Sequence, residues 1–216
     1  MIKKLTLSTI LLASSLFGAN EVNVYSQRHY DSDKIIYKKF EQETGIKVNV
    51  ITAQAEELVA KLAIEGANTP ADVLITADIG NLYQAKKRHL LQPIESKILT
   101  ENVPEKLRDP DNNWFALTQR ARVFVYNPKK VNPDDLSDYL SLADPKFKNK
   151  IVTRSSTSGY NKSLLASIIA NYGEEKALAF AKGLVENMPH NPKGADKDQI
   201  IAVGAGDADI AIVNTY

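Results

Sequence analysis

Short apolar blocks alternate with longer amphipathic segments along the first part of the chain. The apolar blocks have the length of buried strands, and the amphipathic segments repeat at helical spacing. Gly45 and Gly66 follow two of the predicted helices as stop signals, and Asp78 precedes a third as an N-cap. The predicted strands cover 22–25, 47–52 and 71–76, and the predicted helices cover 31–40, 56–65 and 79–88. Strands that alternate with helices of about ten residues predict an α/β fold with a largely parallel sheet.

The second half of the chain has a different pattern. A long extended stretch at 114–126 exceeds the usual strand length, so we expect it to pass between two lobes. The later predicted elements are helices at 134–142, 161–172 and 174–187, strands at 150–153 and 210–213, and a turn bracketed by Gly204 and Gly206. We therefore expect two α/β lobes, at 20–120 and 121–216. Because a strand ends at the last residue, we expect the second lobe to be incomplete.

The first 19 residues have the layout of a secretory signal peptide. Lys3 and Lys4 precede an almost uncharged apolar run, and the small residues Gly18 and Ala19 follow it. The run is too short to span a bilayer. The pattern predicts cleavage after Ala19 and a protein that works outside the cytoplasm. No cysteine stands at the cut, which excludes a lipoprotein.

Composition excludes several classes of function. The chain has 27 Lys and Arg against 26 Asp and Glu, for a net charge of +1, which removes the electrostatic argument for nucleic-acid binding. It has no cysteine, which excludes disulfide scaffolds, thiolate metal sites and cysteine nucleophiles. It also lacks a nucleophile elbow, a Walker loop, a dinucleotide glycine fingerprint and an HExxH pair.

Candidate ligand-binding side chains follow predicted strands. His29 and Tyr30 lie in the loop that leaves the first strand, just before a helix, and ligands bind at the carboxyl ends of strands in open α/β sheets. Tyr160 lies in a strand-to-helix loop of the second lobe, and Tyr216 lies at the end of its last predicted strand. The other two histidines, at 89 and 190, fit a helix end and a solvated loop.

The order and spacing of several short segments resemble the periplasmic ferric-iron-binding proteins of ABC-type importers. The segments are Val24-Tyr25-Ser26, Arg28-His29-Tyr30, Asp72-Val73-Leu74, Arg120-Ala121-Arg122-Val123, Leu142-Ala143-Asp144-Pro145-Lys146, Ser158-Gly159-Tyr160-Asn161 and Gly204-Ala205-Gly206-Asp207 before Asn214-Thr215-Tyr216. The resemblance implies a two-lobed binding-protein fold with hinge-crossing strands, a monomer that is not an enzyme, and delivery of iron to an inner-membrane permease with its ATPase. It also implies that His29, Tyr30, Tyr160 and Tyr216 hold the metal, with a further tyrosine at the next position, which this chain does not include.

The chemistry of these residue types agrees with iron(III). A small, highly charged cation favours anionic oxygen, and a bound metal expels the phenol proton as it does the proton of bound water. Arg120 and Arg122, spaced by two, are expected to project to the same side of a strand. They could hold a synergistic anion beside the metal, pair with tyrosinate oxygens, or form a structural salt bridge, and the sequence leaves these alternatives open.

Two other functions are compatible with the pattern. The same fold could bind thiamine, a polyamine or an oxyanion, which would require aromatic walls or paired acidic residues instead of Tyr160 and Tyr216 together. A hydrolase or transferase could use Asp31 and Asp33 as a carboxylate pair, but both residues are better explained as helix caps.

Overall fold

The computed structural model describes residues 20–215, so the predicted signal peptide and Tyr216 lie outside the described residues. The chain forms two compact units, one that ends at Ala77 and one that begins at Asp78, and each is described by itself. Both units combine helices with a sheet, which confirms the predicted α/β class. The predicted lobe boundary at residue 120 stays a prediction. No helix in the described part of the chain is long and apolar enough to cross a membrane.

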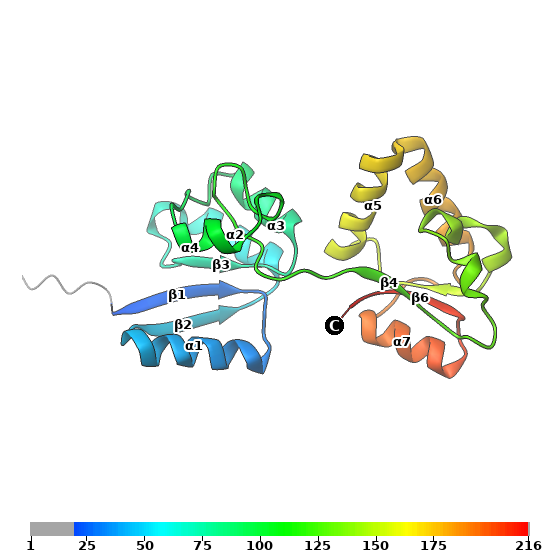
Figure 1. Ribbon diagram of the computed structural model, residues 1–216, viewed down its shortest axis with the longest axis horizontal. Helices are drawn as coiled ribbons and strands as arrows, with labels where there is room; N and C mark the ends of the chain where they lie inside the picture. Colours follow the sequence, from blue (N-terminus) through cyan, green and yellow to red (C-terminus); the bar gives the residue numbers. More distant parts are fainter. Residues whose placement is uncertain (1–19, 216) are drawn as a thin grey trace, which may run out of the picture. The chain divides into compact units, whose positions relative to one another are not determined.

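The first unit contains a parallel three-stranded sheet in the order β2-β1-β3. Its strands are β1 (Glu21–Ser26), β2 (Lys47–Thr52) and β3 (Val73–Ile75), and its helices are α1 (Asp31–Thr44) and α2 (Ala55–Glu65). In Figure 1, α1 lies along β2. The predicted crossover arrangement is therefore confirmed, with strand and helix bounds that differ by a few residues from the expected ones.

Local chemistry explains where these elements begin and end. Gly45 ends α1 with a φ of 70°, a left-handed conformation that glycine adopts without a Cβ clash. Helix α2 buries Leu58, Val59 and Leu62, which recur at helical spacing. Tyr25 at the end of β1 is buried, and its hydroxyl donates to both carboxylate oxygens of Glu65 at 3.0 and 2.9 Å. These contacts join the middle strand of the sheet to α2.

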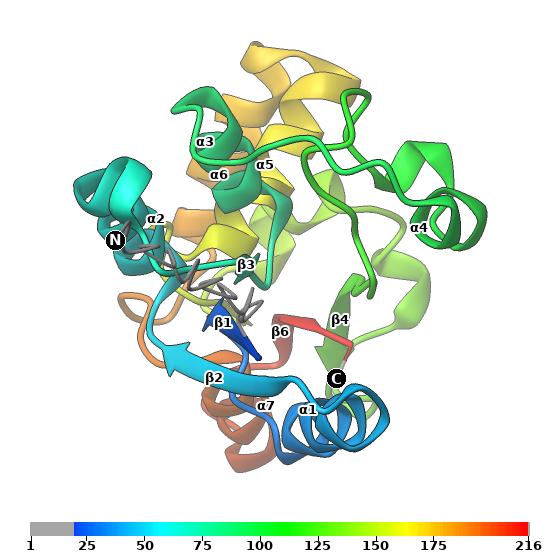
Figure 2. The ribbon, with the colours of Figure 1, turned by 90° about the vertical axis from the view of Figure 1, so that its left-hand side faces the viewer.

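The second unit contains a mixed sheet in the order β4-β6-β5. Strand β6 pairs antiparallel with β4 and parallel with β5, and β4 and β6 lie side by side in both views (Figures 1 and 2). The strands are β4 (Arg122–Tyr126), β5 (Ile151–Val152) and β6 (Ile210–Asn214), and the helices are α3 (Ile79–Lys87), α4 (Lys97–Asn102), α5 (Gly159–Tyr172), α6 (Glu174–Glu186) and α7 (Asp196–Ala205).

Strand β6 is buried along its whole length, because helices cover both faces of its sheet. Ile210 and Ile212 join the larger core cluster with Ile168 of α5 and Phe180 of α6. The alternate residues of β6 join a second cluster, which includes Val203 of α7. Figure 1 shows α5 and α6 on one side of β4 and β6, and α7 on the other. This sandwich of helix, sheet and helix is the core that supports the edge of the sheet described below.

The predicted long strand is much shorter in the structure. Regular pairing covers Arg122–Tyr126 only, because its partner β6 offers five residues, from Ile210 to Asn214. Upstream, Phe115 forms an isolated bridge with Arg108 instead. The expectation of a thirteen-residue strand was therefore wrong, although its C-terminal part is correct.

Two further expectations were wrong. The predicted helix at 134–142 consists of separate short 3₁₀ turns, Pro133–Asp135 and Leu140–Ala143. Side chains there accept hydrogen bonds from nearby backbone N–H groups, as Asp138 Oδ1 does from Ser141 N at 2.8 Å, which competes with continuous helix.

Gly204 was expected to open a turn, but it lies inside α7. The apolar pattern did not predict helix α7, because two of its three buried residues, Asp196 and Gln199, are polar. Gly206, with a φ of 86°, ends the helix and begins the turn into β6.

Candidate functional site

The carboxyl edge of the first sheet positions His29 and Tyr30. Because β1, β2 and β3 are parallel, their carboxyl ends lie at the same edge, and the loop 27–30 leaves β1 there. Gln27 fixes this loop to the end of β3: its backbone N donates to Ile75 O at 2.8 Å, and its side-chain oxygen accepts from Ala77 N at 2.7 Å. The structure therefore places both residues at the edge where ligands of parallel sheets bind.

His29 and Tyr30 form a stacked pair at the surface. Their ring centroids are 5.2 Å apart with an interplanar angle of 20°, and the Arg28 guanidinium carbon lies 5.3 Å from the Tyr30 ring centroid. Tyr30 is 39% exposed and His29 is also exposed, so both side chains are accessible to a ligand. The stack keeps an imidazole and a phenol next to each other.

An ion pair beneath this stack holds the loop against α1. Arg28 Nη2 lies 2.7 Å from Asp33 Oδ1, and Asp33 Oδ2 accepts from Tyr30 N at 3.3 Å. The hydrogen bond that Arg28 donates to the Asp33 carboxylate raises the pKa of Arg28, so the guanidinium stays charged. Asp31 instead pairs with Lys34 at the surface. The N-cap of α1 is Tyr30, so Asp31 and Asp33 are not the N-caps that the sequence suggested; Asp33, at the third helical position, accepts from the Tyr30 backbone N instead.

The second sheet also collects candidate residues at one edge. Strands β5 and β6 are parallel and β4 is antiparallel to β6, so the ends of β5 and β6 lie beside the start of β4. Tyr160 is the second residue of α5, which follows β5 after a short loop. Thr215, the residue before Tyr216, is held at this edge, since its N donates to Ala121 O at 3.0 Å and its hydroxyl accepts from Ala121 N at 3.0 Å.

Three arginine side chains surround Tyr160. Arg120 Nη1 donates to the Tyr160 hydroxyl oxygen at 3.1 Å. The guanidinium carbons of Arg154 and Arg122 lie 5.2 and 5.9 Å from the Tyr160 ring centroid. Arg120 lies just upstream of β4, so the two arginines do not share one strand as predicted, but both contact Tyr160, Arg120 at the hydroxyl and Arg122 at the ring.

Arg122 is occupied by structural contacts. Its side chain is 9% exposed and pairs with Asp196, which is 2% exposed, at 3.1 Å. Its other guanidinium hydrogens go to Asn214 Oδ1 at 3.0 Å, Asn161 Oδ1 at 2.8 Å and Ile212 O at 3.2 Å. Of the alternatives that the sequence left open, the salt bridge is the one that Arg122 forms.

Several residues of this arrangement were not identified from the sequence. Arg154 and Asp196 showed no motif of their own, and Asp196 begins the helix α7 that the apolar pattern did not reveal. Asn161 and Asn214 lie in segments that carry the family resemblance, but nothing in the sequence gave them a role. The side-chain nitrogen of Asn161 donates to Arg154 O at 2.6 Å, which ties the start of α5 to the preceding loop.

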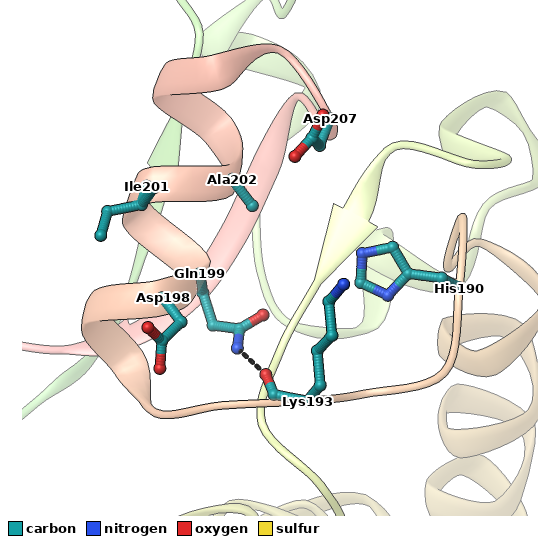
Figure 3. Close-up of a pocket in the computed structure, with 7 residues that line it drawn as sticks. All are labelled: His190, Lys193, Asp198, Gln199, Ile201, Ala202 and Asp207. Carbon is teal, nitrogen blue, oxygen red and sulfur yellow. Dashed lines mark hydrogen bonds between the residues drawn. The ribbon is translucent and has the colours of Figure 1, made fainter.

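A shallow pocket of the second unit lies elsewhere and includes none of the predicted ligands. Figure 3 shows His190 and Lys193 facing helix α7, whose Asp198, Gln199 and Ala202 line the other side. His190 is exposed, and its Nδ1 lies 2.9 Å from Asn191 O, in agreement with the predicted solvated loop. Among residues 20–215, no three histidine or carboxylate side chains gather as a metal site.

Comparison with known proteins gives consistent matches. The family described as bacterial extracellular solute-binding protein matches residues 68–216. Iron uptake protein A1 of Synechocystis sp. is 52% identical over 196 residues, which cover 91% of this chain and 54% of that protein. The ferric binding protein from Campylobacter jejuni superimposes with a TM-score of 0.87 and 52% identity, covering 90% of this chain and 62% of that one.

A third match comes from Trichodesmium. The protein IdiA, or FutA, solved in complex with iron and citrate ligands, gives a TM-score of 0.85 at 46% identity and covers 91% of this chain and 62% of that one. The chain therefore spans between about half and two thirds of the length of these relatives. The matches confirm the resemblance seen in the sequence, and the chain belongs to the family of bacterial extracellular solute-binding proteins.

Proposed function

We propose that this protein binds ferric iron outside the cytoplasm, through His29, Tyr30, Tyr160 and Tyr216. The observation that carries the proposal is that both units present a tyrosine at the carboxyl edge of their sheet, beside arginine side chains. The names of the relatives from Synechocystis and Campylobacter support iron as the ligand. In this proposal ligands from both units bind one metal ion and a hinge motion closes the protein around it.

Charge balance explains why tyrosines suit this task. Three phenolates neutralise a trivalent cation, whereas the carboxylate oxygens of an ordinary cation site also suit calcium and magnesium. His29 adds a neutral nitrogen donor beside Tyr30. Arg120 lies at the Tyr160 oxygen and is the residue best placed to attract a synergistic anion to the metal. Metal binding releases the phenol protons, so acid weakens it.

The proposal includes a place in transport. The predicted signal peptide directs the protein to the periplasm, and the family consists of solute-binding proteins. The protein would deliver iron as a monomer to an inner-membrane ABC permease that is driven by its ATPase, without catalysing a reaction.

The test is to add iron(III), as ferric nitrilotriacetate, to the full-length protein and record the visible spectrum. We expect a charge-transfer band with one equivalent of iron, because phenolate bound to iron(III) absorbs in the visible range and imidazole or carboxylate sites do not. A protein that stays colourless and does not retain iron against nitrilotriacetate would contradict the proposal.

A small anionic ligand without metal is the second candidate. The guanidinium groups of Arg120 and Arg154 beside Tyr160 favour it, because together they attract an oxyanion. Calorimetric titration with phosphate, citrate and carbonate in metal-free solution distinguishes the two functions. Binding of an anion that is as tight without iron as with it favours the second candidate.

A further inference from the structure

The Arg122–Asp196 pair lies at the centre of a network that joins three separate chain segments. These segments are the start of β4, which carries Arg122, the start of α7, which carries Asp196, and the end of β6, which carries Asn214. Asp196 also accepts a hydrogen bond from the backbone N of Asn214 at 3.1 Å, so Arg122, Asp196 and Asn214 all contact one another. A fourth segment, the first turn of α5, joins through Asn161.

Three of the four segments, α5, β6 and β4, lead to a candidate ligand or to its neighbour. Asn161 follows Tyr160 in α5, Asn214 lies two residues before Tyr216, and Arg120 lies two residues before Arg122. Arg122 uses its two terminal nitrogens for Asp196, Asn214, Asn161 and Ile212 O, while its guanidinium lies 5.9 Å from the Tyr160 ring centroid. The planar fork of arginine can hold all these partners at fixed angles, which a lysine could not do.

The network is more polar than the fold alone requires. An ion pair buried this deeply carries a desolvation penalty, and apolar residues of similar volume often stabilise a protein as well or better. Arg122 Nε and Asn214 Nδ2 are also buried without a hydrogen-bond partner among the described residues. Unsatisfied polar groups and local departures from optimal packing are expected where function constrains the structure.

We propose that the Arg122–Asp196 pair is a positioning element for the metal site, which fixes Tyr160 and the segment before Tyr216 relative to each other. The inference rests on the proposed function for its ligand, iron(III). Arg122 contacts the ring of Tyr160 and not its oxygen, so it orients a ligand and does not bind the metal or an anion itself. Groups that orient metal ligands typically change metal affinity on the order of 10- to 100-fold when they are removed.

The principal test variant is Asp196→Asn, which keeps the shape of the side chain and removes the charge that holds Arg122. The matched control is Asp109→Asn, since Asp109 is a similarly buried carboxylate that pairs with Lys86 at 2.7 Å, outside this network. Both variants of the full-length protein are compared with wild type in thermal unfolding, in iron competition against nitrilotriacetate and in the visible band. A second readout without iron is the NMR signal of the Tyr160 ring in ¹³C-tyrosine-labelled protein, assigned with Tyr160→Phe.

We expect Asp196→Asn to lower iron affinity about 10- to 100-fold, to shift the visible band and to move the Tyr160 signal but not the Tyr172 signal. We expect Asp109→Asn to lower the unfolding temperature while it leaves affinity, band and Tyr160 signal unchanged. If Asp196→Asn fails to fold, Asn161→Ala replaces it, because this variant keeps both buried charges paired and removes the link of Arg122 to α5, together with the Asn161 hydrogen bond to Arg154 O.

The outcomes separate this inference from the proposed function. A variant that is less stable but has the wild-type band, affinity and Tyr160 signal overturns the positioning role. A wild-type protein that gives no band overturns the iron function instead, and the Tyr160 signal alone then decides whether the pair positions the ring.

Discussion

The Tyr160 hydroxyl oxygen accepts a hydrogen bond of 3.1 Å from Arg120 Nη1. This contact connects a residue just upstream of β4 with the first turn of α5, although 40 positions separate the two in sequence. In the proposed site the same oxygen coordinates iron(III), so Arg120 lies beside a metal ligand.

We expect Tyr160→Phe to lower iron affinity at least about tenfold, which corresponds to about 1.4 kcal/mol. The change removes one phenolate and leaves the ring between Arg122 and Arg154. Competition with a chelator measures the loss. Tyr172→Phe is the matched control, because Tyr172 ends the same helix and is 46% exposed. Equal losses in the two variants would reject Tyr160 as a ligand.

We expect His29→Ala and Tyr30→Phe to differ in colour as well as in affinity. His29→Ala should weaken binding modestly and keep the visible band, because the phenolates supply the charge transfer. Tyr30→Phe should weaken binding more and change the band, since it removes one negative charge from the site of a trivalent ion. Spectra and competition at pH 7 measure both effects. A band that is lost in His29→Ala and intact in Tyr30→Phe would show that the roles are reversed.

We expect iron to be released as pH falls, with His29→Ala less sensitive than wild type in the mildly acid range. Protons compete with the metal for imidazole and for phenolate, so binding is strongest above the range where these groups take up protons. The visible band is followed during an acid titration of each protein. Identical titration curves would indicate that His29 does not bind the metal.

We expect the Lys86–Asp109 pair to stabilise the second unit above about pH 4 and to lose this effect in acid. Burial raises the pKa of the Asp109 carboxyl, but hydrogen bonds from Lys86 and Asn113 outweigh it and hold the pKa below its ordinary value. A folded-state pKa below the unfolded one gives stability that is present above the unfolded pKa and lost as pH falls through the folded one. Asp109→Asn should therefore lower the unfolding free energy by about 1–3 kcal/mol at pH 7 and by much less at pH 3, as measured by urea unfolding. A difference that does not depend on pH would contradict this account.

We expect Gly183→Ala to destabilise the protein by about 1–3 kcal/mol, although alanine favours helices. A Cβ at Gly183 in α6 would lie 2.6 Å from the Ala143 Cβ and 2.7 Å from Ala143 O, which is closer than packing allows. Gly204→Ala is the control: in α7 the added Cβ meets no atom within 4 Å, so the variant should gain about 0.4–1 kcal/mol. Thermal and urea unfolding of both variants measure the effects. A stable Gly183→Ala protein would show that α6 is not held closely against Ala143.

Much of the first unit was predictable because its elements are determined locally. Gly45 and Gly66 stand at helix ends in the structure, as their backbone preferences predict. The alternation of strands and helices also predicts parallel pairing, which places His29 and Tyr30 at the carboxyl edge. Local preference and tertiary structure agree at these positions.

The second unit shows where local reasoning fails. The buried face of helix α7 carries the polar residues Asp196 and Gln199, so the sequence shows no apolar helical period there. The long extended stretch is a strand only where β6 can pair with it, from Arg122 to Tyr126, because strand length depends on a partner that is distant in sequence. The buried face of α7 and the length of β4 both depend on hydrogen bonds to partners that are distant in sequence, and the hydropathy pattern does not show such bonds.

The sequence by itself determined the α/β class and most element positions, because these follow from residue type and spacing. Its resemblance to the ferric-iron-binding proteins identified the tyrosines and His29 as candidate ligands. Only the tertiary structure decided which arginine contacts the Tyr160 oxygen and which forms a buried salt bridge. Arg120 and Arg122 are equivalent in the sequence, but Arg120 donates to the Tyr160 oxygen while Arg122 is buried against Asp196. The reason is physical: a buried guanidinium needs a carboxylate and several acceptors around it, and here they come from α5, α7 and β6, which meet at this edge of the sheet only after folding.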